Sequence, residues 1–413
     1  MVCPALLIVD AVILSRGGKA AVTINSKVKG RSLGDGPSIV FALAHSAASD
    51  RWNRVPHCQA RAGSPISRNG EAPPALNNAN GAGSSAPNSS PAARPTVRIQ
   101  PMPLLTIRHV TDYRYKAPVS LGEHRIMMRP REAFDQHLLS ARLDIDPKPS
   151  ELRWLHDVFG NSVAMALFEQ RTSQLTVTSE ATLEHAPLAQ GQVDVEAYAK
   201  LFPFTYSSED MPDLLRSIER QHHDPSRIVD NWARKFVSNH GDTETVAMLT
   251  AMATGIKRDF TYVPRHEKGT QTPIETLRKR QGTCRDFAVL MIEAVRALGF
   301  AARFVSGYVY NPSRKEGVVG GGNTHAWVRI FLPGSGWVEF DPTNGIIGNR
   351  GLIRVAIARD PYQALPLSGT WFGLPASFQD MKVTVDVSRA DPDKFPRSTD
   401  GAINSRPVGT SGK

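Results

Sequence analysis

The chain has 413 residues, of which 41% are hydrophobic and 21% charged, a composition typical of a soluble globular protein with more than one domain. The net charge of +10 comes mainly from residues 1–101, which hold 11 Lys and Arg against 4 Asp and Glu. The remainder therefore lacks the concentrated basic face of a nucleic-acid-binding protein. We therefore do not expect nucleic acid as a partner. No apolar run reaches the roughly 18 residues of a membrane-spanning helix, so we do not expect a membrane as a partner either.

Residues 1–101 are predicted to be disordered. From residue 63 to residue 95 the sequence is dense in Gly, Pro, Ser, Asn and Ala and holds almost no large apolar side chain. Such a segment cannot bury enough apolar surface to offset the entropy lost on ordering. Met102 stands where patterned sequence begins, so two interpretations stay open. Residues 1–101 are either a genuine disordered extension or a stretch that is not translated, with Met102 as the true start.

Residues 102–190 are predicted to form an all-β domain. Between Leu105 and Tyr115, residues alternate with the period of two that is typical of a strand. Further short segments rich in β-branched residues lie at 141–145, 151–156, 163–168 and 174–182. Gly160-Asn161 offers the turn chemistry of a hairpin between two of these segments.

Residues 200–390 are predicted to form an α+β domain. From about Asp210 the apolar spacing changes to a helical period, and it indicates five helices. We place these helices at about 210–218, 228–237, 246–256, 273–280 and 284–298. Strands are then predicted at 302–310, 325–331, 336–340, 353–357 and 381–387. Helices followed by an antiparallel sheet favour the α+β class, and the polar residues 391–413 are predicted to be a frayed tail.

The chain has three cysteines, and only Cys284 lies outside residues 1–101. A disulfide framework or a paired-cysteine zinc site is therefore excluded from the two predicted domains. A lone thiol fits a reducing compartment, so we expect a cytoplasmic protein, and no metal or cofactor is indicated.

Cys284 is predicted in the first turn of a helix that begins after Gly282. Thr283 and Asp286 have the spacing of a capping box, in which each side chain meets the backbone N–H of the other. The partial positive charge of the helix N-terminus stabilises a thiolate at this position. The backbone N–H of Cys284 also points to where an oxyanion would form. By position alone, however, a buried structural cysteine is the favoured interpretation.

A base and an orienting residue for the thiol are predicted on a hairpin. His325 begins one strand and Asp341 ends the next, immediately before Pro342. The open ends of a hairpin lie side by side, so Asp341 should accept from the imidazole and fix its tautomer. Taken singly, His325 could be satisfied by local hydrogen bonds and Asp341 could merely close a turn. Together with a cysteine at a helix N-terminus, they have the order and spacing of a thiol acyl-transfer site.

Three motifs of the second domain resemble those of bacterial transglutaminase-like proteins. They are Gly-Thr-Cys-Arg-Asp-Phe-Ala from Gly282, Thr-His-Ala-Trp-Val from Thr324 and Trp-Val-Glu-Phe-Asp-Pro-Thr-Asn-Gly from Trp337. Segments 107–115 and 128–131 are similar to the N-terminal β-domain that precedes the core in this family. The resemblance covers about Met102 to Ala390.

This resemblance implies a papain-like transglutaminase core and acyl transfer from amides through a thioester, as in a peptidase, an amidase or a transamidase. The catalytic Cys, His and Asp of the family fall on Cys284, His325 and Asp341. Tyr262 lies where family members often carry an aromatic residue that helps the oxyanion hole, although a core aromatic residue fits this position at least as well. A protein or peptide substrate is implied. Whether water or an amine accepts the acyl group, and the oligomeric state, stay open.

Two other functions fit parts of the pattern. A non-catalytic binding module could keep the fold, but such a module would typically lose Cys284 or His325, and both are present. A mononuclear zinc hydrolase could use the same three side chains as ligands. The chain, however, has neither an HExxH motif nor paired cysteines.

Overall fold

The computed structural model describes residues 103–186, 193–265, 269–311 and 322–390, together with two short paired strands, β1 (Ile13–Leu14) and β2 (Ala21–Val22). The predicted disorder over the rest of residues 1–101, the start at Met102 and the frayed tail 391–413 lie outside the described residues. Both predicted domains belong to one compact unit of the chain. In the described ranges, no helix is both long and apolar enough to cross a membrane.

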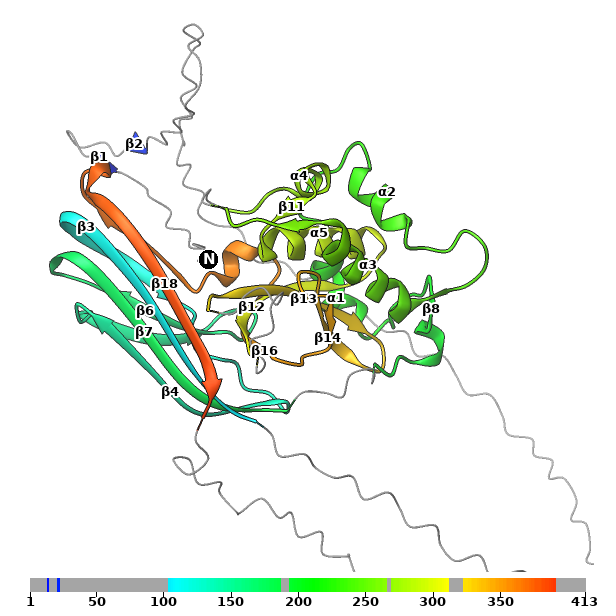
Figure 1. Ribbon diagram of the computed structural model, residues 1–413, viewed down its shortest axis with the longest axis horizontal. Helices are drawn as coiled ribbons and strands as arrows, with labels where there is room; N and C mark the ends of the chain where they lie inside the picture. Colours follow the sequence, from blue (N-terminus) through cyan, green and yellow to red (C-terminus); the bar gives the residue numbers. More distant parts are fainter. Residues whose placement is uncertain are drawn as a thin grey trace, which may run out of the picture. The chain divides into compact units, whose positions relative to one another are not determined.

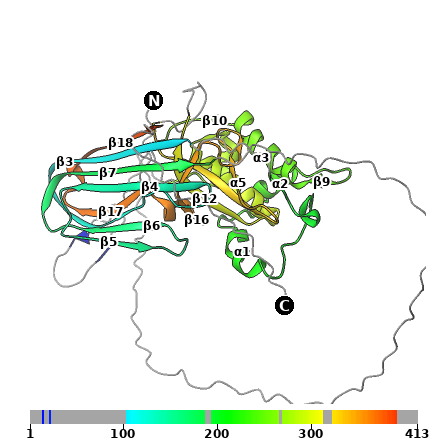
Figure 2. The same ribbon diagram turned by 90° about the horizontal axis from the view of Figure 1, so that it is seen from below.

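The first sheet is built around β3 (Leu104–Ile126), which is 23 residues long. Its strand order is β4-β7-β3-β6-β5, and β17 and β18 also pair with β3. Figure 2 shows β18, β3, β7 and β4 lying side by side in that order. These strands are β4 (Gln136–Asp146), β5 (Glu151–His156), β6 (Ser162–Leu167), β7 (Arg171–His185), β17 (Leu367–Phe372) and β18 (Phe378–Arg389). Alternate residues of β3, from Leu105 to Tyr115, are buried, as the two-residue period predicts. Gly160, with a φ of +69°, makes the predicted turn between β5 and β6.

The second sheet is the antiparallel sheet of the core, in the order β15-β14-β13-β12-β16. Its strands are β12 (Ala302–Val309), β13 (His325–Leu332), β14 (Gly336–Asp341), β15 (Ile346–Ile347) and β16 (Leu352–Ala358). The helices are α1 (Met211–Ile218), α2 (Ile228–Arg234), α3 (Thr245–Asp259), α4 (Pro273–Lys279) and α5 (Cys284–Ala297). Helix α5 packs against β12 and β13 (Figure 1), and its residues Phe287 and Leu290 share one hydrophobic cluster with Val328 of β13. The predicted α+β class and the all-β region that precedes the helices are confirmed.

One predicted strand lies in the other sheet. Residues 381–387 were expected among the core strands, but they belong to β18, which pairs with β3 from Leu105 to Tyr115. Its alternating pattern fits the half-buried face of either sheet, so the pattern could not distinguish them. The pairing is favourable because this half of β3 would otherwise carry a row of unpaired backbone N–H and C=O groups.

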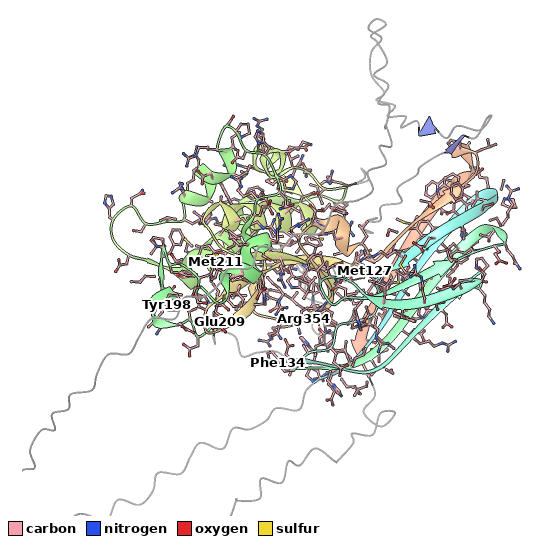
Figure 3. The ribbon with its side chains drawn as sticks, turned by 180° about the vertical axis from the view of Figure 1, so that it is seen from behind. Met127, Phe134, Tyr198, Glu209, Met211 and Arg354 are labelled. Atoms are coloured by element: carbon pink, nitrogen blue, oxygen red, sulfur yellow. The ribbon has the colours of Figure 1, made fainter. Side chains whose placement is uncertain are left out.

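The two sheets share an apolar cluster and buried polar contacts. Leu105 of β3 belongs to one hydrophobic cluster with Ile353 of β16. Arg354 of β16, labelled in Figure 3, is buried and pairs with Asp135 and with Glu339, whose Oε1 lies 3.0 Å from Nη1. The two carboxylates balance the positive charge of the buried guanidinium and accept its hydrogen bonds. These contacts fix the strands of the core against the first sheet.

Candidate active site

Cys284 occupies the first turn of α5, as the capping-box spacing predicts. Strand β11 (Gln281–Gly282) leads into the helix, and Thr283 and Asp286 form the capping box. The side chain of Cys284 is only 5% exposed and belongs to the same apolar cluster as Phe287. The packing holds the sulfur at the helix N-terminus, where the helix dipole favours a negative charge.

Asp286 organises more than the capping box. It is fully buried, and its carboxylate accepts from the backbone N–H of Thr283 at 2.7 Å and from the backbone N–H of Gln271 at 2.7 Å. The guanidinium of Arg265 donates to it at 3.0 Å from Nε. Its charge is therefore balanced, and three chain segments converge on the turn that carries Cys284. The sequence indicated Asp286 as a cap but gave no sign of Arg265 or Gln271 as its partners.

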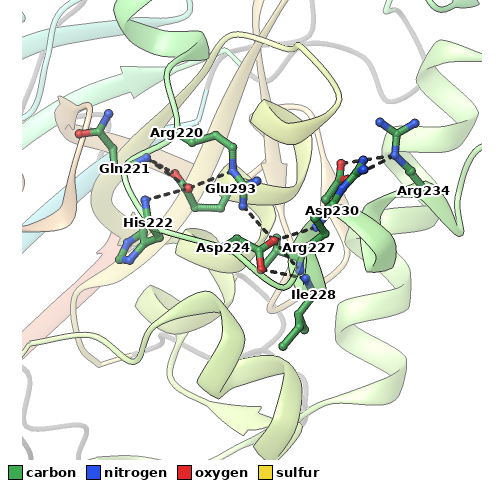
Figure 4. A network of polar contacts seen from close by, with 10 residues as sticks. Arg220, Gln221, His222, Asp224, Arg227, Ile228, Asp230, Arg234 and Glu293 are labelled. Atoms are coloured by element: carbon green, nitrogen blue, oxygen red, sulfur yellow. Dashed lines mark hydrogen bonds and ion pairs between the residues drawn. The ribbon is translucent and has the colours of Figure 1, made fainter.

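The C-terminal half of α5 is fixed by a second buried carboxylate. Glu293 is 1% exposed and accepts from the backbone N–H groups of Gln221 and His222 at 3.1 Å (Figure 4). Arg296, one turn further, donates to Glu293 at 3.1 Å and to the carbonyl oxygen of Ser217 at 2.9 Å. Both ends of the helix are thus held by satisfied buried charges, which limits movement of the helix relative to the sheet.

His325 and Asp341 meet at the open end of the β13–β14 hairpin. Nε2 of His325 lies 2.8 Å from Oδ2 of Asp341, and both side chains are completely buried. Nδ1 of His325 is also buried and has no hydrogen-bond partner among the described residues. Nδ1 is therefore the ring nitrogen that remains for a reacting partner, and Cys284 lies close enough to the ring to raise the pKa of His325.

The electrostatics of the pair favour charged forms. Burial by itself lowers the pKa of His325, but the Asp341 carboxylate and the neighbouring Cys284 outweigh it and raise this pKa to about 10. Burial likewise opposes ionisation of Asp341, yet His325 and the amide of Asn344 keep the pKa of Asp341 below its ordinary value. Both shifts favour the imidazolium form, with Nε2–H directed to the Asp341 carboxylate.

The turn after Asp341 supplies the rest of its hydrogen bonds. Oδ1 accepts from the backbone N–H groups of Thr343 at 2.9 Å and Asn344 at 3.2 Å. Oδ2 accepts from Nδ2 of Asn344 at 2.7 Å, in addition to His325. Gly345 has a φ of +65°, which lets the turn close. Asn344 was not predicted as a site residue, although an Asn-Gly pair straight after Asp-Pro-Thr is a turn signal that could have drawn attention to it.

Trp327 supports the histidine from the same strand. The rings of His325 and Trp327 lie 6.0 Å apart between centroids and are inclined by 25°. Trp327 is fully buried, so it fixes the orientation of the imidazole ring as well as excluding water. The sequence contains this residue in its His motif, but its stacking role depends on the tertiary structure.

Tyr262 lies next to the turn of Cys284. It belongs to β10 (Thr261–Tyr262), which pairs parallel with β11, and its register partner is Gly282. Its side chain is half-buried and packs against the cluster that contains Cys284. This position agrees with either predicted role, in the oxyanion hole or in the core.

The described residues contain no group of three or more His, Cys, Asp and Glu side chains arranged to hold a metal ion. His325 uses Nε2 for Asp341 and leaves Nδ1 for Cys284, and the two nitrogens of one imidazole point in different directions. These three side chains therefore do not converge on a single point, as ligands of one zinc ion would have to do.

Comparisons with known proteins relate both parts of the chain to one family. Residues 105–184 match the bacterial transglutaminase-like N-terminal region, and residues 230–342 match the transglutaminase-like superfamily. A protein-glutamine gamma-glutamyltransferase of Pseudomonas aeruginosa is 35% identical over 115 residues, which cover 26% of this chain and 17% of that protein. An uncharacterised protein of Mycobacterium tuberculosis is 29% identical over 279 residues, or 64% of this chain and 86% of that protein.

A solved structure shares the fold. A candidate cysteine protease from Cytophaga hutchinsonii superimposes with a TM-score of 0.55 and 19% sequence identity, over 71% of this chain and 92% of that chain. At this identity the match shows the fold alone. It agrees with the papain-like arrangement of a helix that carries Cys284 against an antiparallel sheet that carries His325 and Asp341.

Proposed function

We propose that this chain, which belongs to the transglutaminase-like superfamily, is a thiol-dependent enzyme that transfers acyl groups from amide bonds through a thioester on Cys284. The observation that supports it best is the position of His325, buried between the Asp341 carboxylate and the Cys284 thiol. A histidine held in this way keeps one N–H directed at the reacting groups.

The proposed reaction has two halves. In the first, the Cys284 thiolate attacks the amide carbonyl carbon, a C–S bond forms, and the negative charge moves to the carbonyl oxygen. The backbone N–H of Cys284 at the helix N-terminus donates to that oxygen, and the hydroxyl of Tyr262 is the second donor. The C–N bond then breaks, and Nδ1–H of His325 gives its proton to the leaving amine.

In the second half, the now neutral His325 removes a proton from water or from an amine, which attacks the thioester. The C–S bond breaks, and the thiolate returns to Cys284 beside the protonated imidazole. Water gives a carboxylic acid, and an amine gives a new amide. We propose a protein or peptide substrate, and the 35% identity to a protein-glutamine gamma-glutamyltransferase makes the side-chain amide of glutamine the first candidate.

The decisive experiment uses a Cys3→Ala/Cys58→Ala variant, in which Cys284 is the sole thiol. This variant is incubated with a panel of electrophiles based on glutamine and on peptides, and the intact mass is recorded. We expect one adduct per chain that is absent from the same variant carrying Cys284→Ala. Turnover should need a reductant and survive a chelator. Rapid labelling of unfolded protein only, with no labelling of native protein, would contradict the proposal and favour a non-catalytic binding module.

A further inference from the structure

The side chains of His325, Asp341 and Asn344 all contact one another. Nε2 of His325 lies 2.8 Å from Oδ2 of Asp341, Nδ2 of Asn344 lies 2.7 Å from the same oxygen, and the two nitrogens are 3.3 Å apart. All three side chains are buried, Asn344 being 5% exposed. One carboxylate oxygen therefore accepts from both the imidazole and the side-chain amide.

We propose that Asn344 is a positioning residue of this site, whose side-chain amide directs Oδ2 of Asp341 at His325 and so orients the imidazole through that carboxylate. This inference rests on the proposed function, because it gives Asn344 a part in holding the base of that reaction. The amide donates to Asp341 and stands within contact distance of Nε2 of His325. A carboxylate at residue 344 would thus have the reach to take over the role of residue 341.

The side chain of Asn344 acts separately from its backbone. The turn is closed by backbone donors: the N–H groups of Thr343 and Asn344 bind Oδ1 of Asp341, and the N–H of Gly345 binds the carbonyl oxygen of Asp341 at 2.7 Å. Asn344→Ala and Asn344→Asp both retain these backbone N–H groups. A role limited to the turn would therefore leave catalysis unchanged when only the amide is altered.

The chemistry of residue 344 favours an amide in the wild type. With Asp341 present, a second carboxylate at residue 344 would face Oδ2 at hydrogen-bond distance and repel it. An apolar residue would leave Oδ2 with one donor fewer in a buried place. When residue 341 is an amide, however, an aspartate at residue 344 could accept from both Nε2–H of His325 and the new amide. The two groups would have exchanged positions.

The test is this exchange of groups. Four variants are compared with wild type for kcat, KM and the pH profile of Cys284 alkylation: Asn344→Ala, Asp341→Asn, the double variant Asp341→Asn/Asn344→Asp, and Asn231→Asp. Asn231 is exposed on α2, so it is a control for the added charge. We expect Asn344→Ala to lower kcat by about tenfold with little change in KM, and the exchange to recover at least about tenfold of what Asp341→Asn loses.

The outcomes separate the two proposals. Recovery of kcat and of the wild-type alkylation profile in the exchanged variant, with Asn231→Asp unchanged, supports the role of Asn344. An exchanged variant that is folded but no better than Asp341→Asn, or wild-type kcat in Asn344→Ala, overturns it and leaves the thiol mechanism intact. If instead Cys284→Ala retains turnover, the proposed function itself is wrong.

Discussion

Gly307 of β12 is the register partner of His325 on β13, and the strand has no room for a side chain there. A Cβ on Gly307 would lie 2.7 Å from the Trp327 ring and would overlap the carbonyl oxygen of Ile353. Its φ is not in the left-handed region, so space rather than backbone conformation requires a glycine. The Trp327 ring can stack beside the imidazole because Gly307, the register partner of His325, has no side chain to occupy that space.

Gly307→Ala should therefore damage both stability and the site. We expect the free energy of unfolding to fall by about 1 to 3 kcal/mol, because overpacking shifts the surrounding backbone. The rate of Cys284 alkylation should fall as well, since Trp327 and with it His325 must move. The control is Gly255→Ala in α3, where the added methyl meets the Phe236 ring at 3.3 Å and the helix gains propensity. Wild-type stability and alkylation in Gly307→Ala would contradict this explanation.

Asp341→Asn tests the orientation of the base. The backbone donors of Thr343 and Asn344 select the carbonyl oxygen of the new amide, so its NH2 group faces Nε2 of His325. The imidazole would then keep its proton on Nδ1 and lose the partner that stabilises its charged form. In a serine triad the corresponding change costs about 10⁴ in kcat. We expect a smaller loss here, roughly 10 to 10³, because a thiolate at a helix end depends less on a base. Steady-state kinetics of folded protein would check this, and unchanged kcat would reduce Asp341 to a turn residue.

The raised pKa of His325 predicts how stability changes with pH. Its pKa in the folded protein is about 10, above the ordinary value of 6.5. Folding is therefore favoured while the imidazole is charged, and this contribution is complete below about pH 6.5 and is lost as the pH rises towards 10. The pKa of Asp341 is lowered, so its contribution is present above the ordinary value of 3.8 and is lost in acid.

We accordingly expect the difference in unfolding free energy between wild type and His325→Gln to shrink between pH 6.5 and pH 10. Urea unfolding at half-unit intervals of pH would measure it. The exposed His223→Gln variant serves as the control for the loss of a histidine that lies outside the site. A difference that grows with pH would show that the imidazole is buried in its neutral form.

Asp286→Asn should destabilise the N-terminal turn of α5. The substitution leaves the Arg265 guanidinium partly buried beside a neutral amide. The NH2 group of that amide, a donor, replaces one of the two carboxylate oxygens that accept from Arg265. Breaking a buried pair in this way costs about 3 to 5 kcal/mol, and we expect the lower end because Arg265 is 17% exposed and retains access to water. The matched control is Glu275→Gln, which removes the exposed pair with Lys279 and should change stability by less than about 1 kcal/mol. Equal effects in the two variants would refute the special role of Asp286.

Local patterns predicted most elements of the core. All five helices and the His–Asp hairpin follow from apolar spacing, caps and turn residues, which are determined within short windows of sequence. The hairpin also places His325 beside Asp341, because a short turn between two strands determines which of their residues face each other. The catalytic roles of these residues, and of Tyr262, stay predictions.

The contacts that were missed join segments far apart in the chain. Arg265 reaches Asp286 across 21 residues, and His109 of β3 binds Tyr308 of β12 across 199 residues, with 2.9 Å between Nδ1 and the hydroxyl oxygen. No periodicity encodes such pairs, because they depend on how finished elements pack. The position of β18 could not be predicted for the same reason, because its alternating pattern indicates a strand but not the sheet that the strand joins.

The pairing of β18 with β3 also determines when the first sheet can be completed. Arg389 is the register partner of Leu105, and the N–H of Ala390 binds the carbonyl oxygen of Leu104 at 2.9 Å. During synthesis β3 leaves the ribosome well before β18, which follows only after all five helices and the second sheet have been made. Until then, one edge of β3 is open to any extended chain nearby, including a second nascent copy. A chain that ended before residue 378 would lack β18 altogether, so the edge of β3 from Leu105 to Tyr115 would stay unpaired and could join the edge of another chain.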